Sequence, residues 1–277
     1  MREAIGVPIE VPGPGASWGP VEAALMDRGT VAVFARWSGW LPPDCGAPGL
    51  VDRLGAHDWR RSGAMTNPAA RARFVATRLL TRYTAAAALR IAPEEVDLAY
   101  RPGGRPYLRG CGHVEVALTH TGDTAAVALS RLGRVGVDME PLDRHMSYDG
   151  VRRLLCTPAE RDAVGGLPEA ERSRALLRLW TLKEAYAKAM GQGMRMGFAG
   201  FGFALDGLEL LARDGTPISP GEWAFGVYEV GGRHLLSVAR HAAGWEPSAR
   251  TGVQDLLDAD FLDEVTRAQE LSEPLFE

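Results

Sequence analysis

Cysteine, lysine and long apolar runs are scarce in this chain of 277 residues. The three cysteines, Cys45, Cys111 and Cys156, lie far apart and form no C-x-x-C motif, which argues against a disulfide framework and against a zinc site. No apolar run approaches the ~20 residues of a membrane span, and the N-terminal residues lack the apolar core of a signal peptide. We therefore expect a cytoplasmic protein in a reducing compartment, with no membrane partner.

An excess of positive charge is also absent, because the formal net charge is −4. The whole molecule is therefore not a polyanion binder, so no nucleic-acid partner is expected, and a phosphate-rich ligand would need a local basic patch. Hydrophobic residues make up 46% of the chain, which is enough for the core of one large domain or of two smaller ones.

Lysine is the scarcest of the common charged residues. Of the 31 Lys plus Arg residues, only Lys183 and Lys188 are lysine. We interpret this as a coding bias toward arginine that leaves lysine only where an ammonium group is needed, since ammonium can give up its proton and guanidinium effectively cannot. Chance is the alternative, although two lysines within six residues of each other make it less attractive.

The pattern of apolar and turn residues predicts strands and helices without regular alternation, which favours an α+β fold. Two long helices are expected over about 69–89 and 168–190, and the capping box Thr157-Pro-Ala-Glu160 predicts the start of another. Residues 1 to about 50 are predicted to be extended, and an acidic amphipathic helix is predicted at 245–277. The expected strands cover residues 30–36, 114–119, 125–129, 134–140, 201–205, 223–230 and 235–239.

Asp138 and Glu140 fall on one face of the strand predicted at 134–140, because alternate side chains of a strand share a face. Two carboxylates on one face repel each other unless a cation lies between them, and such oxygen ligands suit Mg²⁺. The alternative is a strand edge with two solvated acids, which the D-x-E pattern alone favours.

Trp180, Glu184 and Lys188 are spaced by four residues and share one face of the helix predicted at 168–190. The alternative is an ordinary Glu–Lys surface pair beside a core tryptophan. Because both lysines of the chain fall in this segment, we favour a functional interpretation.

Taken as a pair, these two segments resemble a known family. Gly136-Val-Asp-Met-Glu140, followed about forty residues later by Trp180-Thr-Leu-Lys-Glu-Ala-x-x-Lys188, is similar to the paired signature of the Sfp-type 4′-phosphopantetheinyl transferases. The resemblance covers roughly residues 50–240. Other landmarks agree in order: Gly104-Arg105-Pro106 resembles the family's Gly-Lys-Pro, Leu118-Thr-His-Thr121 resembles its Ile-Ser-His-Ser, and Arg73 matches an arginine on an early helix.

The resemblance implies two similar α+β subdomains with the active site at their interface. We expect an N-terminal subdomain at 1–133 with the coenzyme A nucleotide contacts, a C-terminal subdomain at 134–244 with the metal site and the catalytic helix, and the acidic extension at 245–277. A monomer is expected, with a dimer as the alternative.

The resemblance also implies a reaction. Enzymes of this family transfer 4′-phosphopantetheine from coenzyme A to a serine hydroxyl of an acyl or peptidyl carrier protein and release adenosine 3′,5′-bisphosphate. It implies that Asp138, Glu140 and Glu184 bind Mg²⁺, that Glu184 is the base and that Lys188 stabilises the leaving phosphate. The residues it implies for coenzyme A binding are Arg73, Gly104, Arg105, Pro106, Thr119, His120, Asp138 and Lys183.

Several of these residues have a structural interpretation as well. His120 suits a core or turn histidine, Thr119 an ordinary strand residue and Arg73 a surface charge. Glu160 matches a family glutamate that could act as a base, but its position three residues after Thr157 explains it as a capping-box partner, which we favour.

Two departures from the family pattern and two other functions are left open. Ala117 stands where the family often has Asn, and Arg105 replaces the commoner Lys. The same residues would also suit a Mg²⁺-dependent hydrolase of nucleotide diphosphates, or an inactive module that binds carrier proteins. The sequence does not fix which carriers are used, whether acylated coenzyme A is accepted, or whether Met190, Met194, Met196 and Phe198 belong to the core or to a carrier-binding patch.

Overall fold

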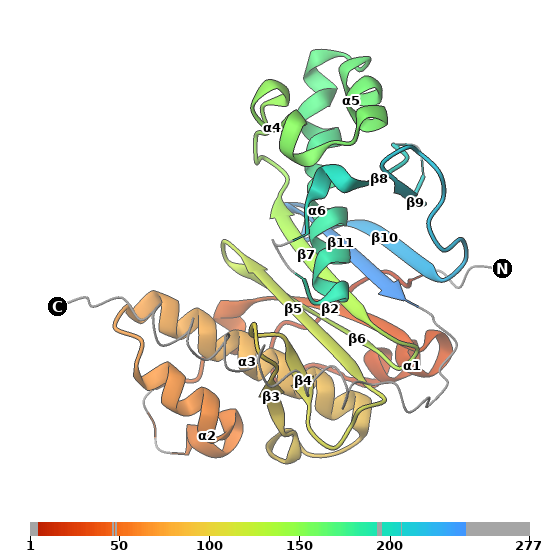
Figure 1. Cartoon of the computed structure of the whole chain (residues 1–277). Helices are drawn as coiled ribbons and strands as arrows, with labels where there is room; N and C mark the ends of the chain where they lie inside the picture. Colours follow the sequence, from red (N-terminus) through yellow and green to blue (C-terminus); the bar gives the residue numbers. More distant parts are fainter. Residues whose placement is uncertain (1–4, 46, 48, 193–195, 206, 242–277) are drawn as a thin grey trace, which may run out of the picture. The chain divides into compact units, whose positions relative to one another are not determined.

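The computed structural model describes residues 5–241, apart from residues 46, 48, 193–195 and 206. Within this range the chain forms a mixed α+β fold (Figure 1) of two roughly repeated halves, each with a sheet and a 22-residue helix packed on it. The predicted α+β class is confirmed. No helix of the described part is long and apolar enough to cross a membrane, and the acidic helix predicted at 245–277 lies outside the described residues.

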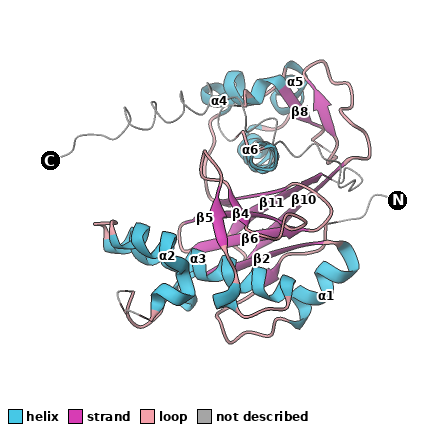
Figure 2. Cartoon of the chain, turned by 60° about the horizontal axis from the view of Figure 1, so that its bottom comes forward, coloured by secondary structure: helices cyan, strands magenta, loops and turns pink. Residues whose placement is uncertain are grey.

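The N-terminal half is built on a four-stranded sheet of order β1 (Ile9–Glu10), β2 (Thr30–Arg36), β6 (Thr124–Ser130) and β5 (Glu115–Thr121). The first pair is parallel and the others are antiparallel. Figure 2 shows three helices together on one side of this sheet: α1 (Gly19–Arg28), α2 (Leu50–Gly63) and α3 (Pro68–Leu89). A hairpin of β3 (Leu98–Tyr100) and β4 (Pro106–Leu108) and 3₁₀ turns at Trp37–Trp40 and Pro93–Glu95 complete this half.

The C-terminal half is built on an antiparallel sheet of order β10 (Trp223–Val230), β11 (His234–His241) and β7 (Val135–Pro141). The long helix α6 (Glu169–Met190) packs on this sheet. The remaining elements are α4 (Tyr148–Leu155), α5 (Pro158–Gly165), a 3₁₀ turn at Phe198–Gly200, and the short pair β8 (Phe201–Phe203) and β9 (Leu210–Ala212).

An apolar layer joins the two sheets. Val137 and Met139 of β7 belong to it, together with Ala126 and Ala128 of β6. All the described residues fall in one compact unit. The subdomain boundary predicted near residue 133 falls between β6 and β7, and the division at that residue stays a prediction.

Most predicted elements are present, and the errors are concentrated near helix-breaking residues. The predictions for β2 and β10 match their observed bounds, and α3 and α6 begin within one residue of the predicted starts. Residues 1 to about 50 were predicted to be extended, which is wrong for Gly19–Arg28. The pair Gly19-Pro20 suggests a turn, but proline near the start of a helix is well tolerated, and Gly29 in the left-handed conformation ends α1. The helices α2 and α4 were not predicted.

Gly136 sets the distance between β7 and α6. It lies on the face of β7 opposite to Val137, and a Cβ atom built there would lie 1.9 Å from the carbonyl oxygen of Ala185 and 2.6 Å from the nitrogen of Ala189. Both contacts are with helix backbone, which cannot move aside as a flexible side chain can. Only glycine therefore allows α6 to pack this closely on the strand.

We expect Gly136→Ala to destabilise the protein by about 1–3 kcal/mol, the usual cost of forcing an extra methyl group into a packed interior. Urea unfolding followed by circular dichroism measures this change. Gly112→Ala is the matched control, because a Cβ at Gly112 would meet nothing within 4 Å. Equal stability of the two variants would contradict this account of the β7–α6 contact.

Candidate active site

Four polar side chains meet where β5, β7 and α6 approach one another. The Nζ of Lys188 donates hydrogen bonds to Asp138 Oδ1 at 2.7 Å and to Thr119 Oγ1 at 3.2 Å. Thr119 Oγ1 in turn lies 3.4 Å from Asp138 Oδ1, to which its hydroxyl donates. Glu184 lies one helical turn before Lys188, and its charge interacts with that of Asp138. The structure thus brings together one residue from β5, one from β7 and two from α6, all of which the family resemblance named as site residues.

The second carboxylate oxygen of Asp138 is unsatisfied. Asp138 is only 6% exposed, and its Oδ2 atom is buried and has no hydrogen-bond partner within the described part of the chain. Buried polar atoms are nearly always hydrogen-bonded, so an exception needs an explanation such as a missing ion. This atom is therefore available to a ligand that the protein itself does not supply.

Glu140 and Glu184 both have raised pKa values. Burial raises the pKa of Glu184, the negative charge of Asp138 raises it further, and Lys188 partly opposes the shift. Burial also raises the pKa of Glu140, against the effect of its ion-pair partner Arg144. Arg144 itself lies over the ring of Trp180, 5.0 Å from its centre. Carboxylates that burial and a like charge both penalise would be stabilised by an additional cation.

The donors fit Mg²⁺ chemically, but they are not gathered into a ligand set. Among residues 5–241 with the stated gaps, no three His, Cys, Asp or Glu side chains converge closely enough to hold a metal ion. Asp138 is held by Lys188 and Glu140 by Arg144. Three carboxylates, one of which has the orphaned Oδ2 of Asp138, suit a hard cation. Ligation by Asp138, Glu140 and Glu184 therefore stays a prediction, and it requires these ion pairs to rearrange.

A cavity of about 220 Å³ opens beside this cluster. Lys188 belongs to both the cluster and the cavity wall, so the two are continuous. The other lining residues come from the β3–β4 hairpin, from β5 and from α3: they include Arg78, Tyr100, Gly103, Gly104, Arg105, Pro106, Ala117 and Leu118. The predicted Gly104-Arg105-Pro106 segment therefore lies next to the predicted catalytic helix, although 80 residues of sequence separate them.

Arg105, in the wall of this cavity, is held by hydrogen bonds to two different elements. Its guanidinium donates to the carbonyl oxygen of Ala189 at 2.7 Å and to Glu115 Oε2 at 2.8 Å. A Cβ atom on Gly191 would lie 3.3 Å from its Nη1 atom. Arg105 therefore fastens the end of α6 to the N-terminal half, a structural contribution that the sequence did not reveal.

His120 and Arg73 lie at the rim of the same region. His120 is exposed at the end of β5. Partial desolvation lowers its pKa, and the positive charges of Arg73, Arg78 and Lys188 lower it further. His120 therefore lies within the electrostatic reach of three cationic side chains, and an anion bound beside it would oppose their effect on its pKa.

Lys183 must be corrected, because the structure leaves it no contact with a cofactor. The side chain is 0% exposed, and its Nζ is within 2.6–2.8 Å of Glu160 Oε2 and of the carbonyl oxygens of Leu155, Phe198 and Phe201. These contacts are with the segments around α4, α5 and β8, whereas Lys188 contacts Asp138 on β7. An ammonium group that satisfies several acceptors in a closed space explains this lysine without any need for proton release.

Glu160 has the structural role that the sequence favours. Its carboxylate accepts from the Thr157 N–H, and Thr157 Oγ1 accepts from the Glu160 N–H, which completes the capping box of α5. The same carboxylate accepts from the N–H of Phe203 and pairs with Lys183. Glu160 is buried among these partners.

Three residues near the site were missed by the sequence analysis. Tyr100 lines the cavity, Glu115 holds Arg105, and Arg144 pairs with Glu140. Tyr100 and Glu115 gave no signal, because nothing in the sequence places the hairpin against α6. Arg144 lies four residues after Glu140 and could have been noticed as a charge partner.

Comparison with known proteins agrees with this geometry. A family model described as the 4′-phosphopantetheinyl transferase superfamily matches residues 134–239, which contain β7, α6 and β11. A phosphopantetheinyl transferase of Thraustochytrium sp. is 28% identical over 247 residues, covering 83% of this chain and 85% of that protein. The chain belongs to the 4′-phosphopantetheinyl transferase superfamily.

Other relatives support this membership. The 4′-phosphopantetheinyl transferase HetI of Nostoc sp. is 25% identical over 215 residues, covering 74% of this chain and 86% of that protein. A putative 4′-phosphopantetheinyl transferase of Synechocystis sp. is 29% identical over 154 residues, covering 54% of this chain and 62% of that protein. Three of the four residues of the cluster in this transferase, Asp138, Glu184 and Lys188, lie inside the segment that the family model matches.

We expect Glu184→Gln to raise the Tm of the metal-free transferase by a few degrees at neutral pH. A raised pKa means that folding penalises the ionised form, so the cost appears as the pH rises above the unfolded-state value of about 4.3 and is absent below it. Calorimetry in EDTA at several pH values measures the difference, which should shrink in acid.

Mg²⁺ should then raise the Tm of the original protein more than that of Glu184→Gln, because the amide is the poorer ligand. Asp162→Asn, at an exposed position of α5, serves as the control and should show neither effect. A Tm of Glu184→Gln that is equal to or below that of the original protein in EDTA would contradict the burial argument.

Proposed function

We propose that the protein transfers 4′-phosphopantetheine from coenzyme A to a serine hydroxyl of an acyl or peptidyl carrier protein, with Mg²⁺, and releases adenosine 3′,5′-bisphosphate. The observation that carries the proposal is the cluster of Asp138, Lys188 and Thr119 beside the cavity, with one carboxylate oxygen left unsatisfied. Family membership supports the reaction class.

Binding of the donor would use the basic groups around the cavity. Arg78 in the cavity wall and Arg73 near His120 supply positive charge, and charge-assisted hydrogen bonds from guanidinium groups are the usual means of holding phosphate. His120, whose pKa is lowered, would contribute a neutral imidazole hydrogen bond. A cavity of about 220 Å³ suits one ring system or phosphate group rather than the whole donor. The remainder of coenzyme A would therefore extend along the surface toward the acidic cluster.

Transfer needs a base for the serine proton. Glu184 is the candidate, because burial and the charge of Asp138 raise its pKa and so make it a stronger base than an exposed glutamate. The serine oxygen forms a bond to the phosphorus of the phosphopantetheine, its proton passes to Glu184, and the bond from that phosphorus to the bridging oxygen breaks. A magnesium ion held by Asp138, Glu140 and Glu184 would neutralise the diphosphate charge.

The leaving group carries a new negative charge on its phosphate oxygen. We assign its stabilisation to Lys188, a role supported by the position of the ammonium in the cavity wall and by its hydrogen bonds to Asp138 and Thr119. A positioned cation at the site of developing charge lowers the barrier without reorganising during the reaction. Thr119 thereby acts through Lys188 and is a positioning residue.

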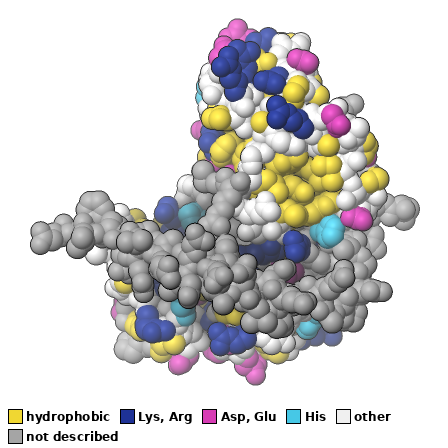
Figure 3. Space-filling view, in the orientation of Figure 1, with side chains coloured by type: hydrophobic (Ala, Val, Ile, Leu, Met, Phe, Trp, Pro, Cys, Tyr) yellow, Lys and Arg dark blue, Asp and Glu magenta, His cyan; other side chains and the backbone are white. Residues whose placement is uncertain are grey.

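The carrier protein would dock near α4, which follows shortly after the end of β7 that carries Glu140. Leu154 is 79% exposed, and Arg153 beside it is exposed as well. Figure 3 shows basic side chains gathered at the end of the molecule that carries α4 and α5. An exposed leucine among arginines suits an amphipathic helix with an acidic rim. Met190, Met196 and Phe198 are partly buried against the core, and Met194 lies outside the described residues.

The transfer assay tests the proposal directly. The protein is incubated with coenzyme A, Mg²⁺ and apo carriers of the fatty acid, polyketide and nonribosomal peptide types, and the carriers are weighed by intact mass spectrometry. A mass gain of one phosphopantetheine is expected on at least one carrier. Cleavage of coenzyme A that is independent of the carrier would instead support a hydrolase.

The same assay tests the roles on α6. Glu184→Ala and Lys188→Ala are each expected to reduce kcat by at least about 100-fold, the usual contribution of a general acid or base. Asp162→Asn should leave kcat unchanged. Undiminished transfer by Glu184→Ala would show that another group takes the serine proton.

Reversal of charge on α4 tests the docking surface. We expect the double variant Arg153→Glu/Leu154→Asp to raise the KM for the carrier several-fold and to leave the KM for coenzyme A unchanged, because the change affects only the encounter with the carrier. Arg213→Glu, at another exposed arginine of the C-terminal half, is the control. An unchanged carrier KM in the double variant would place docking elsewhere.

A further inference from the structure

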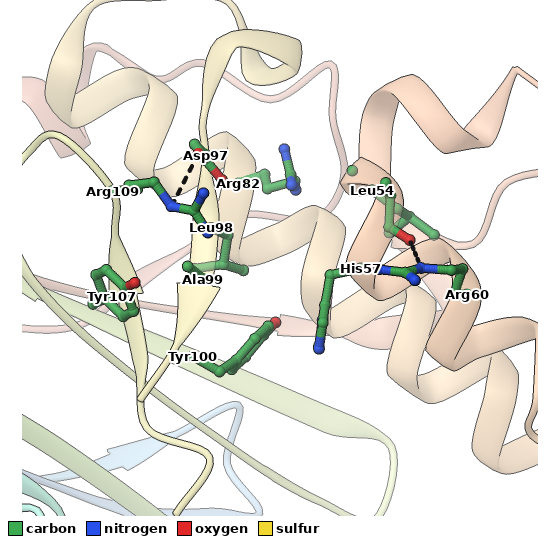
Figure 4. A pocket seen from close by; sticks show the side chains of 12 residues that line it. Leu54, His57, Arg60, Arg82, Asp97, Leu98, Ala99, Tyr100, Tyr107 and Arg109 are labelled. Atoms are coloured by element: carbon green, nitrogen blue, oxygen red, sulfur yellow. Dashed lines mark hydrogen bonds and ion pairs between the residues drawn. The ribbon is translucent and has the colours of Figure 1, made fainter. Parts of the chain in front are cut away.

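A second cavity, of about 370 Å³, lies in the N-terminal half between α2, α3 and the β3–β4 hairpin (Figure 4). None of the residues predicted to bind coenzyme A or Mg²⁺ lines it. Tyr100 lines both this cavity and the one beside Lys188. The two are therefore neighbours but have otherwise different walls.

Three arginines line this second cavity, Arg60, Arg82 and Arg109, together with the imidazole of His57 and a single carboxylate, Asp97. Asp97 pairs with Arg109 at 3.4 Å, and both of these side chains are exposed. Arg60 is exposed, donates to the carbonyl oxygen of Ala56 and makes no ion pair with any described residue, so its charge is available to a ligand.

Arg82 is the most unusual of these groups. It is 3% exposed, and one of its Nη atoms donates to the carbonyl oxygen of Val96. Its Nε has no hydrogen-bond partner in the described part of the chain, where no carboxylate forms an ion pair with it. Burial lowers the pKa of Arg82, and the charges of Asp58, Asp97 and Glu94 partly oppose this shift, that of Asp58 most strongly. Buried guanidinium groups are normally paired directly, so the free Nε of Arg82 could receive an acceptor that the described chain does not supply.

The course of α2 adds hydrogen-bond donors at the same place. The helix is interrupted at Gly55, which has φ +73° and ψ 155°, and it resumes toward Gly63. The first N–H groups of a helical segment lack partners within the helix and carry the positive end of its dipole. Gly55 and Ala56 line the cavity. A Cβ on Gly55 would lie 2.4 Å from an Nη atom of Arg82, so the guanidinium packs directly against the point where the helix is interrupted.

We propose that this cavity binds a small phosphate-bearing ligand. Arginine forks and the N-terminal N–H groups of a helix are the two common protein partners of phosphate oxygens, and both occur here on facing walls. Leu98, Tyr100 and Tyr107 line the remaining space, which exceeds the volume of a single phosphate. The ligand would therefore carry an apolar or planar body beside its phosphate, as a nucleotide does.

Hydrogen–deuterium exchange of the full-length protein tests this, with inorganic phosphate as the probe and no coenzyme A, Mg²⁺ or carrier present. Phosphate is expected to protect the amides of residues 54–58 in a concentration-dependent manner. Acetate at the same ionic strength should not protect them. Absence of protection with phosphate would overturn the proposal, and equal protection with acetate would overturn the assignment to phosphate.

Variants make the test specific to this cavity. The double variant Arg60→Gln/Arg109→Gln keeps Arg82 and is expected to need at least about tenfold more phosphate for half protection, since it loses two charge-assisted donors. Arg53→Gln, an exposed arginine of α2 outside the cavity lining, is the control and should match the original protein. Unchanged protection in the double variant would overturn the site.

Adenosine 3′,5′-bisphosphate then tests the body of the ligand. It should protect residues 54–58 at lower concentration than phosphate does, and this preference should persist when Arg73 is replaced by Gln. If protection by the nucleotide at residues 54–58 disappears in Arg73→Gln, the effect comes from the cavity beside Lys188 and the second site is overturned. Because the readout is binding, failure of the transfer reaction would leave this result unaffected.

Discussion

The close contact between β7 and α6 is the constraint on which the rest of the site depends. At Gly136 the strand lies so near the helix that no Cβ atom fits. This proximity allows Lys188, one helical turn beyond Glu184, to reach Asp138 across the gap. The same short distance keeps Asp138 buried. Burial makes it energetically unfavourable to leave one of its oxygens without a hydrogen bond, and it strengthens the effect of the Asp138 charge on the pKa of Glu184. Local packing therefore sets the chemistry of the whole cluster.

Local patterns were sufficient to predict which residues share a face, but not which elements face each other. Alternation along β7 placed Asp138 with Glu140, and the spacing of four residues placed Glu184 with Lys188. Neither pattern predicts that the β3–β4 hairpin brings Arg105 into contact with the end of α6. That contact depends on tertiary packing between distant segments. Prolines and glycines misled the prediction for α1, where Pro20 begins a helix rather than preventing one. Gly55 similarly concealed α2 by interrupting it.

The predicted metal-ligand set did not take into account that two of its carboxylates have cationic partners within the protein. Asp138 and Glu140 are each paired with a basic side chain, Lys188 and Arg144. In a buried cluster of acids these cations take the place that the sequence analysis gave to a metal. Binding of Mg²⁺ would therefore be an exchange of one positive charge for another. Its affinity would depend on how easily Arg144 leaves Glu140, as much as on the carboxylates themselves.

The two lysines, which the sequence presented as one functional pair, have opposite surroundings. Lys183 is enclosed by four acceptors and has no exposed surface, whereas Lys188 is partly open beside the cavity. The chain contains no other lysine. In the native protein, an amine-directed reagent would thus find a single side-chain target, and that target lies at the centre of the candidate active site. Because arginine replaces lysine elsewhere in the chain, Lys188 is the lysine that such a reagent would label selectively.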